Sequence, residues 1–198
     1  MTTCAIVLAA GAGVRMGGRV KQLLPLGGRP LVQHPIDAAV AAGLEDVVVV
    51  LGHAAEEVAA VLALPPGGAV VVNPLYAAGQ STSLHAGVDA LPCSARAALV
   101  LLGDQPEVGA AAIRAVVEAH ARRGAPVVRA AYGGRPSHPV LLGHEVWPGV
   151  QGLRGDQGAR ALIAAHGPRV ELVDLTGPAP EDVDTADDYD RLLARLGP

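Results

Sequence analysis

The chain has 198 residues, a net charge of -4 and a composition that is 51% hydrophobic but only 2% aromatic. A nucleic-acid-binding protein would show a basic surface or stacking aromatic residues, so this class is disfavoured. No basic segment precedes the first apolar run, no apolar run is long enough to span a membrane, and Cys4 and Cys93 form no CxxC pair. We therefore expect a cytoplasmic protein without a membrane segment.

Strands and helices are predicted to alternate along the first two thirds of the chain. Apolar runs that end in glycine or polar residues predict strands at residues 4–9, 46–51, 69–73, 97–102 and 126–131. The segments between them predict helices at residues 30–42, 54–64, 81–91 and 109–123. This alternation predicts an α/β fold with three α/β/α layers and a mostly parallel, Rossmann-like sheet.

After residue 132 the rhythm changes, because glycine and proline crowd residues 133–139 and 148–158. The remaining pattern predicts a short strand at 140–142, a helix at 158–166, a strand at 170–175 and a closing helix at 185–196. We interpret this region as an elaboration over one end of the sheet, so that residues 1–198 form a single domain.

A glycine-rich loop follows the first strand and leads to the single lysine of the chain, Lys21. Gly11 and Gly13 would let the backbone approach a ligand and present its N–H groups, while Arg15 and Lys21 add positive charge. This composition favours a triphosphate-binding loop. A dinucleotide fingerprint would need glycine at Met16, and a P-loop would need serine or threonine after the lysine. A turn that binds no ligand stays open as an alternative.

Asp104 and a later acidic cluster that contains Asp182 and Asp184 could hold a divalent cation. Asp104 ends the strand at 97–102, and magnesium is usually bound by one or two carboxylates together with substrate phosphates. Asp182 and Asp184 would share one side of an extended segment and could complete the site. The alternative for Asp104 is a turn or helix cap. The alternative for the second cluster is a helix N-terminus capped by Thr185.

The segment Gly79-Gln80-Ser81-Thr82-Ser83 opens a predicted helix with amide and hydroxyl groups. These groups could contact a nucleobase edge or simply cap the helix, and the residues alone leave both interpretations open. The seven histidines show no metal-ligand spacing.

A series of motifs occurs along the chain. The opening of the chain carries Leu8-Ala9-Ala10-Gly11-x-Gly13-x-Arg15-Met16-Gly17 and then Lys21-Gln22-Leu23-Leu24-Pro25-Leu26. The later motifs are Gly79-Gln80-Ser81-x-Ser83-Leu84, Gly103-Asp104-Gln105-Pro106, His138-Pro139-Val140-Leu141, Gly155-Asp156-x-Gly158-Ala159-Arg160 and Asp182-x-Asp184-Thr185-x-x-Asp188. In this order, these motifs resemble the MobA-like nucleotidyltransferases, and most closely their molybdenum cofactor cytidylyltransferase (MocA-type) branch.

The resemblance implies a sheet of the nucleotide-diphospho-sugar transferase type and transfer of CMP from CTP to the phosphate of the molybdopterin-molybdenum cofactor, with release of pyrophosphate. It implies Mg²⁺ as cofactor, and a recipient molybdoenzyme is a further possible partner. The guanylyltransferase branch has Leu-Ala-Gly-Gly where this chain has Leu8-Ala9-Ala10-Gly11, which favours cytosine over guanine.

The resemblance also assigns roles to residues. Lys21, Arg15 and Asp104 would be catalytic, and Asp104, with Asp184 and Asp182, would hold the metal. The residues expected to bind the nucleotide are Leu8, Ala9, Ala10, Gly11, Ala12, Gly13, Gly79, Gln80, Ser81 and Ser83. His138 and Asp156 would face the acceptor. Residues 1–131 would then bind the nucleotide, and residues 132–198 would form the acceptor-binding elaboration and the closing helix.

Other functions remain as alternatives. Near ones are a GTP-dependent guanylyltransferase and a nucleotidyltransferase for another phosphorylated acceptor. A non-catalytic carrier or insertion factor for a molybdoenzyme would need the acceptor pocket but not the triphosphate loop. An NAD-dependent oxidoreductase is disfavoured by the fingerprint that Met16 breaks.

Overall fold

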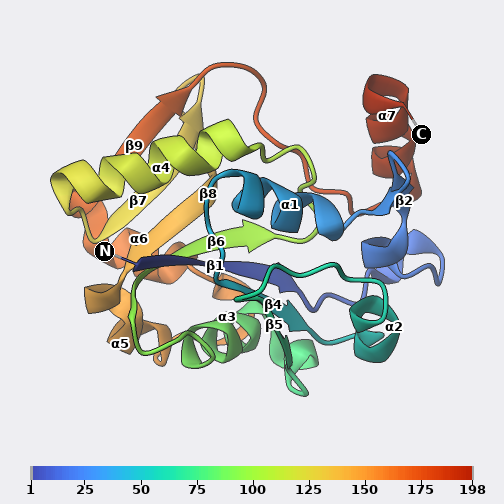
Figure 1. Ribbon diagram of the computed structural model, residues 1–198, viewed down its shortest axis with the longest axis horizontal. Coiled ribbons are helices and arrows are strands. Elements are labelled where there is room, and N and C mark those ends of the chain that lie inside the picture. Colours follow the sequence, from blue (N-terminus) through green and yellow to red (C-terminus); the bar gives the residue numbers. More distant parts are fainter. Residues whose placement is uncertain (1, 198) are drawn as a thin grey trace.

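The computed structural model describes residues 2–197. A seven-stranded sheet with the order β5-β4-β1-β6-β8-β7-β9 forms its centre (Figure 1). The strands are β1 (Thr2–Ala9), β4 (Val47–Leu51), β5 (Ala69–Val72), β6 (Ala95–Leu102), β7 (Val127–Tyr132), β8 (Arg135–Gly143) and β9 (Val170–Leu175). Neighbouring strands pair in parallel except at β8, which runs antiparallel to both β6 and β7.

Helices cover both faces of this sheet. One face packs against α1 (Gln33–Ala41), α2 (Ala55–Ala59) and α4 (Ala110–Arg123). The other face packs against α3 (Gln80–Asp89), α5 (Trp147–Val150) and α6 (Arg160–His166). The strand β4 is buried along its whole length, as expected for a parallel strand between two helical layers.

A third, smaller cluster lies beyond the edge of the two main cores. It joins the short hairpin of β2 (Pro25–Leu26) and β3 (Arg29–Pro30) to the last helix, α7 (Ala186–Leu196), which stands away from the sheet (Figure 1). Met16 is buried in this cluster with Tyr189 and Leu192. The hydroxyl of Tyr189 also donates a hydrogen bond to the carbonyl of Pro25. The glycine-rich loop is therefore anchored on α7.

The structure confirms the three-layer α/β/α fold and its mostly parallel sheet. The helix predicted at 30–42 begins only at Gln33, because Arg29 and Pro30 pair with β2. The helix predicted at 54–64 is the short α2. The strand predicted at 140–142 extends from Arg135 to Gly143, which places His138 inside the sheet. Within residues 2–197, no helix has both the length and the apolar character that crossing a membrane requires.

Gly87 is a close contact between α3 and the sheet. A Cβ atom at this position would lie 2.6 Å from Cγ2 of Ile6 on β1. We expect Gly87→Ala to destabilise the protein by about 1–3 kcal/mol, although alanine is normally the better helix former. Urea unfolding measures the effect, and Gly152→Ala is the control because its Cβ would meet nothing closer than 3.4 Å. Equal stability of the two variants would contradict this packing.

Candidate functional site

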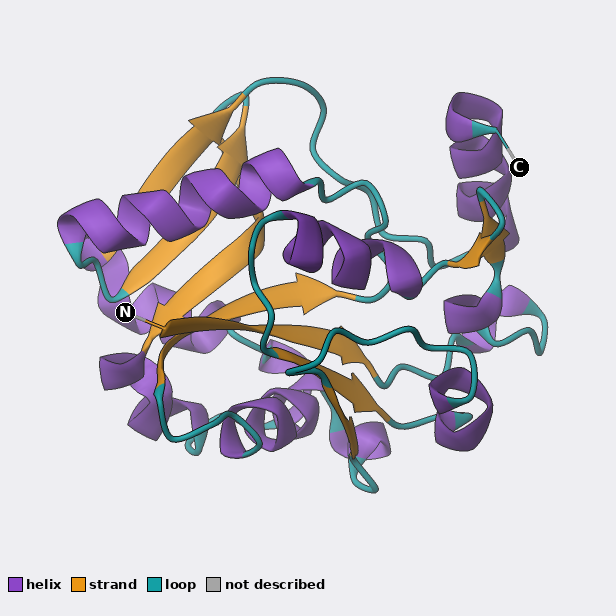
Figure 2. Ribbon diagram, viewed as in Figure 1, coloured by secondary structure: helices purple, strands orange, loops and turns teal. Residues whose placement is uncertain are grey.

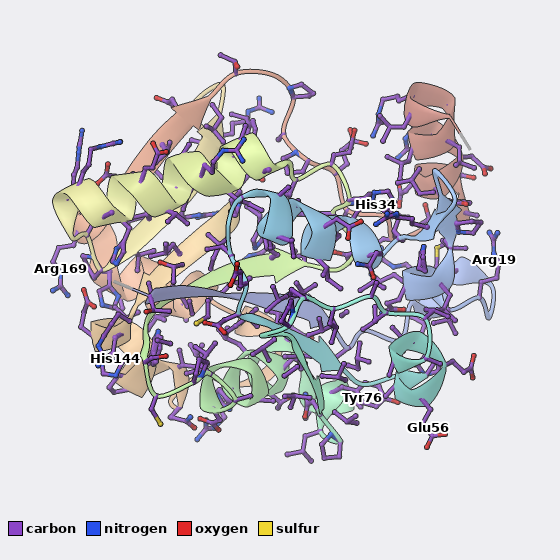
Figure 3. The ribbon with its side chains drawn as sticks, viewed as in Figure 1. Arg19, His34, Glu56, Tyr76, His144 and Arg169 are labelled. Atoms are coloured by element: carbon purple, nitrogen blue, oxygen red, sulfur yellow. The ribbon has the colours of Figure 1, made fainter. Side chains whose placement is uncertain are left out.

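The carboxyl ends of β1 and β6 lead into loops that gather at one end of the molecule (Figure 2). Tyr76 and Arg19 lie at this end, whereas His144 and Arg169 lie at the opposite end (Figure 3). The loops enclose a cavity of about 230 Å³. The predicted site residues that line it are Leu8, Ala9, Ala10, Gly11, Lys21, Gly79, Gln80, Ser83, Asp104 and Asp156.

Gly13 makes room for the stem of Lys21. A Cβ atom on Gly13, whose φ is +57°, would lie 3.3 Å from Cγ of Lys21, and one on Gly11 would lie 4.0 Å from its Cε. Gln22 is buried and donates hydrogen bonds from Nε2 to the carbonyls of Ala9 and Gly11, at 3.0 and 2.8 Å. The conformation of the loop thus accommodates the side chain of Lys21 and is fixed by hydrogen bonds from Gln22.

Lys21 joins two carboxylates that are far apart in the sequence. Its Nζ lies 2.5 Å from Oδ2 of Asp104 and 3.1 Å from Oδ1 of Asp184, and its side chain is only 9% exposed. Burial by itself lowers the pKa of Lys21, but attraction to Asp104 and hydrogen bonds with both carboxylates outweigh it and raise the pKa above the ordinary value. The lysine therefore stays charged at neutral pH.

Arg15 extends this charged cluster towards solvent. Its Nη2 lies 2.8 Å from Oδ2 of Asp184, and its side chain is 66% exposed. Asp184 is held in place by the start of α7, where its backbone N–H donates to Oδ2 of Asp188. Thr185 and Asp188 form a capping box, as the alternative interpretation of this acidic cluster predicted. Capping and ion pairing therefore coexist in one segment.

Asp182 and Asp184 do share one side of their segment, and Val183 between them is buried in the third cluster. The backbone N–H of Val183 donates to the carbonyl of Asp104, which holds the segment next to β6. Asp182 accepts a hydrogen bond from Nε2 of Gln105 at 2.8 Å. Asp182 is thus tied to Gln105, while Asp184 contacts the lysine.

The donor set fits a divalent cation shared with a substrate. Oδ1 of Asp104 is buried and has no hydrogen-bond partner among residues 2–197. Within the same residues, no group of three or more His, Cys, Asp or Glu side chains could hold a metal by itself. Magnesium commonly takes one or two carboxylates and completes its shell with phosphates and water. Asp104 and Asp184 would fit that arrangement.

The segment before α3 is positioned by a residue that the sequence did not single out. Asn73 is buried and donates from Nδ2 to Oγ1 of Thr82 and Oγ of Ser83. Gly79 lies against another loop, because a Cβ atom there would be 2.3 Å from the carbonyl carbon of Gly155. This contact brings Asp156 to the first cavity, although it was expected on the acceptor side.

A second cavity of about 350 Å³ adjoins the first and shares Gln80, Leu102 and Asp104 with it. His138 lines this second cavity, as do Asp182 and Asp184. Three residues expected at the nucleotide, Ala12, Gly13 and Ser81, are not among those lining the first cavity. Two adjoining cavities that share Asp104 are an arrangement that could place two substrates side by side.

The comparisons with known proteins identify the family. Residues 5–170 match the MobA-like NTP transferase domain. The chain belongs to this family. The resemblance seen in the motifs and the prediction of an enzyme of the nucleotidyltransferase type are thereby confirmed.

Individual relatives of this MobA-like transferase differ in their names. The chain is 34% identical to the nicotine blue oxidoreductase of Paenarthrobacter nicotinovorans, over 95% of both chains. Its structure is similar to that of Rv0371c from Mycobacterium tuberculosis H37Rv, with 31% identity, a TM-score of 0.87 and 98% of each chain covered. Another structure of Rv0371c is a complex with manganese.

A nucleotidyl transferase from Methanothermobacter thermautotroptrophicus is also similar, with 26% identity and a TM-score of 0.81 over 98% of this chain and 97% of that one. These likenesses extend over nearly the whole chain. They therefore include both cavities and the segment before α7.

Sequence patterns did not assign Tyr76 and Asn73 to the site, nor did they predict that Gln22 fixes the glycine-rich loop. Tyr76 lines the first cavity and packs over Gly52, where a Cβ atom would lie 2.6 Å from the tyrosine side chain. Its rarity was the available signal, since the chain has three tyrosines and no phenylalanine. An aromatic ring at such a wall could stack on a nucleobase.

Gln22 and Gln33 provide a matched test of the loop. Each is a buried glutamine whose amide holds a backbone segment, residues 9–11 for Gln22 and Ala63 for Gln33. We expect Gln22→Ala to raise amide hydrogen exchange in residues 10–13 by about tenfold, because two hydrogen bonds are lost. Gln33→Ala should raise exchange near Ala63 only. Unchanged exchange in residues 10–13 of the Gln22 variant would contradict the anchoring role.

Proposed function

We propose that the protein transfers CMP from CTP to the phosphate of a molybdopterin-molybdenum acceptor and releases pyrophosphate. The observation that carries the proposal is the cluster at the shared wall of the two cavities, where Lys21 is held between Asp104 and Asp184. One cavity would take the nucleotide and the other the acceptor, so that both phosphates meet at this cluster.

In the proposed reaction an oxygen of the acceptor phosphate attacks the α-phosphorus of CTP. A new P–O bond forms to the acceptor, the bond to the β-phosphate breaks, and pyrophosphate leaves. The attacking oxygen is already anionic, so no general base is required, and the main barrier is repulsion between two anions. Positioning and charge neutralisation therefore account for most of the catalysis.

The residues of the chain divide this work. Lys21 would neutralise charge at the α-phosphate, and the exposed Arg15 would reach the pyrophosphate end. N–H groups of residues 10–13 would add donors. Asp104, with Asp184 and Asp182 as further candidates, would hold Mg²⁺, which when bound supplies positive charge between phosphate oxygens. The manganese complex of Rv0371c supports a divalent metal in this family.

Nucleotide choice rests on the first cavity. Ala10 and the segment Gly79 to Ser83 line it in part. The guanylyltransferase branch has glycine where this chain has Ala10 and a Gly-Pro-Leu-Ala-Gly-like segment where it has Gly79 to Leu84, and both differences favour CTP over GTP. Tyr76 would stack on the base. His138 would contact the acceptor from the second cavity, while Asp156 reaches the nucleotide side instead. A GTP-dependent enzyme or another phosphorylated acceptor is the nearest alternative.

We expect Lys21→Ala to lower kcat/KM by about 10² to 10⁴-fold, because a buried charge at the reacting phosphate is lost. Asp104→Asn should abolish the dependence of turnover on Mg²⁺. Asp89→Asn is the control, since Asp89 on α3 accepts a hydrogen bond from Gln151 and lines neither cavity. Thermal melts confirm that each variant is folded. Wild-type kinetics in folded Lys21→Ala would remove the lysine from the mechanism.

A substrate panel tests the function as a whole. CTP, GTP and ATP are each combined with molybdopterin-molybdenum or with sugar phosphates, and pyrophosphate release is measured. We expect the highest rate with CTP and the pterin acceptor. Tight binding of the cofactor without pyrophosphate release would support the carrier alternative instead.

The same panel includes NADH and NADPH with a dye acceptor, because one relative is a nicotine blue oxidoreductase. Nicotinamide oxidation without any pyrophosphate release would overturn the transferase assignment. The expected result is pyrophosphate release without nicotinamide turnover.

A further inference from the structure

The second cavity has a charge pattern that its neighbour lacks. Asp104, Asp182 and Asp184 lie on its wall, but so do Arg129 of β7 and Arg160 at the start of α6. The first cavity is lined by Lys21 and by no arginine among the described residues. Arg129 and Arg160, which come from separate elements, therefore line the second cavity and not the first.

Neither arginine is neutralised by the protein. Within residues 2–197, no carboxylate lies within 4.0 Å of the guanidinium of Arg129 or Arg160. Nε of Arg129 is buried and has no hydrogen-bond partner in the same part of the chain. Burial and the nearby Arg160 lower the pKa of Arg129. A buried donor without an acceptor and two neighbouring positive charges each destabilise the folded protein. An anionic ligand would accept the hydrogen bond and offset the charges.

His138 lies with this pair. Burial, together with Arg129 and Arg160, lowers its pKa to about 4. The imidazole is therefore neutral at pH 7 and adds a hydrogen-bonding group without a third positive charge. A pair of arginines and one neutral donor suits an anion with several acceptor oxygens.

We propose that Arg129 and Arg160 form a subsite for the phosphate monoester group of the acceptor. Arginine forks bind phosphate oxygens in pairs, and two of them leave other oxygens of the same phosphate free to react. This subsite rests on the proposed function for its role, although anion binding there does not require turnover.

The same chemistry could serve the phosphates of the nucleotide or the leaving pyrophosphate. The triphosphate has its own surroundings in the first cavity, where the glycine loop and Lys21 lie. The second cavity contains none of the loop residues 8–13. An acceptor phosphate is therefore the better occupant, and the experiment below separates the sources.

The binding test uses tungstate as a phosphate analogue and inorganic phosphate in solution. Crystals grown with CTP and Mg²⁺ are soaked in tungstate, and its anomalous signal is located. We expect a peak between Arg129 and Arg160 that disappears in Arg129→Gln and Arg160→Gln. Phosphate should stabilise the wild-type protein in thermal melts and should do so far less in either variant. Arg169→Gln is the control, because Arg169 lines neither cavity, and it should keep both effects.

The kinetic test compares substrates. Arg129→Gln and Arg160→Gln should raise KM for the acceptor by about tenfold or more, while KM for CTP and inhibition by pyrophosphate stay unchanged. Arg129→Lys should recover only part of the lost affinity for the acceptor, because lysine keeps the positive charge but cannot donate two parallel hydrogen bonds as a guanidinium does. A raised KM for CTP, or weaker inhibition by pyrophosphate, would assign the arginines to the nucleotide and overturn the proposal.

The two proposals fail separately. Tungstate bound at the arginines in a protein without nucleotidyl transfer would overturn the proposed function and keep the anion subsite. Transfer activity with unchanged acceptor KM in both glutamine variants, and tungstate elsewhere, would overturn the subsite and keep the function.

Discussion

The bridge from Lys21 to Asp104 and Asp184 is the interaction on which the site depends. It joins the loop after β1, the end of β6 and the segment before α7. A buried ammonium without these carboxylates, or the carboxylates without the ammonium, would be strongly unfavourable. Gly13 leaves space for the lysine stem, and the capping box of α7 orients Asp184. The conformations of these three segments thus position the charged groups of a single ion-pair cluster.

Much of this arrangement could be predicted from the sequence. Parallel strands place their carboxyl ends at one edge, so the residues after residues 4–9 and 97–102 had to meet there. Lys21 and Asp104 followed from that rule, but their direct contact did not, because it depends on how the loop is held. Met16 is an example of a residue whose structural role the sequence did not reveal. In the sequence it only breaks a fingerprint, whereas in the structure it anchors the loop on α7.

The second cavity was harder to predict because sequence patterns do not record strand direction. The apolar run at residues 140–142 is the same whether the strand runs parallel or antiparallel, and only the pairing of β8 with β6 and β7 shows the reversal. That pairing places His138 in the second cavity beside Arg129. The arginine itself occurs in an apolar strand with no motif around it, so its location depends on long-range packing that a single sequence does not reveal.

The contact between Gly79 and Gly155 couples the lining of the first cavity to that of the second. Gly79 opens the helix at the first cavity, and Gly155 begins the turn that leads to Arg160 at the second. Their backbones leave no room for a side chain at position 79, so a new residue there must displace the turn as well. Under the proposed function, a substitution at position 79 that alters the preference for one nucleoside triphosphate would therefore also alter the preference for the acceptor. Independent tuning should begin at residues such as Tyr76, which line one cavity only.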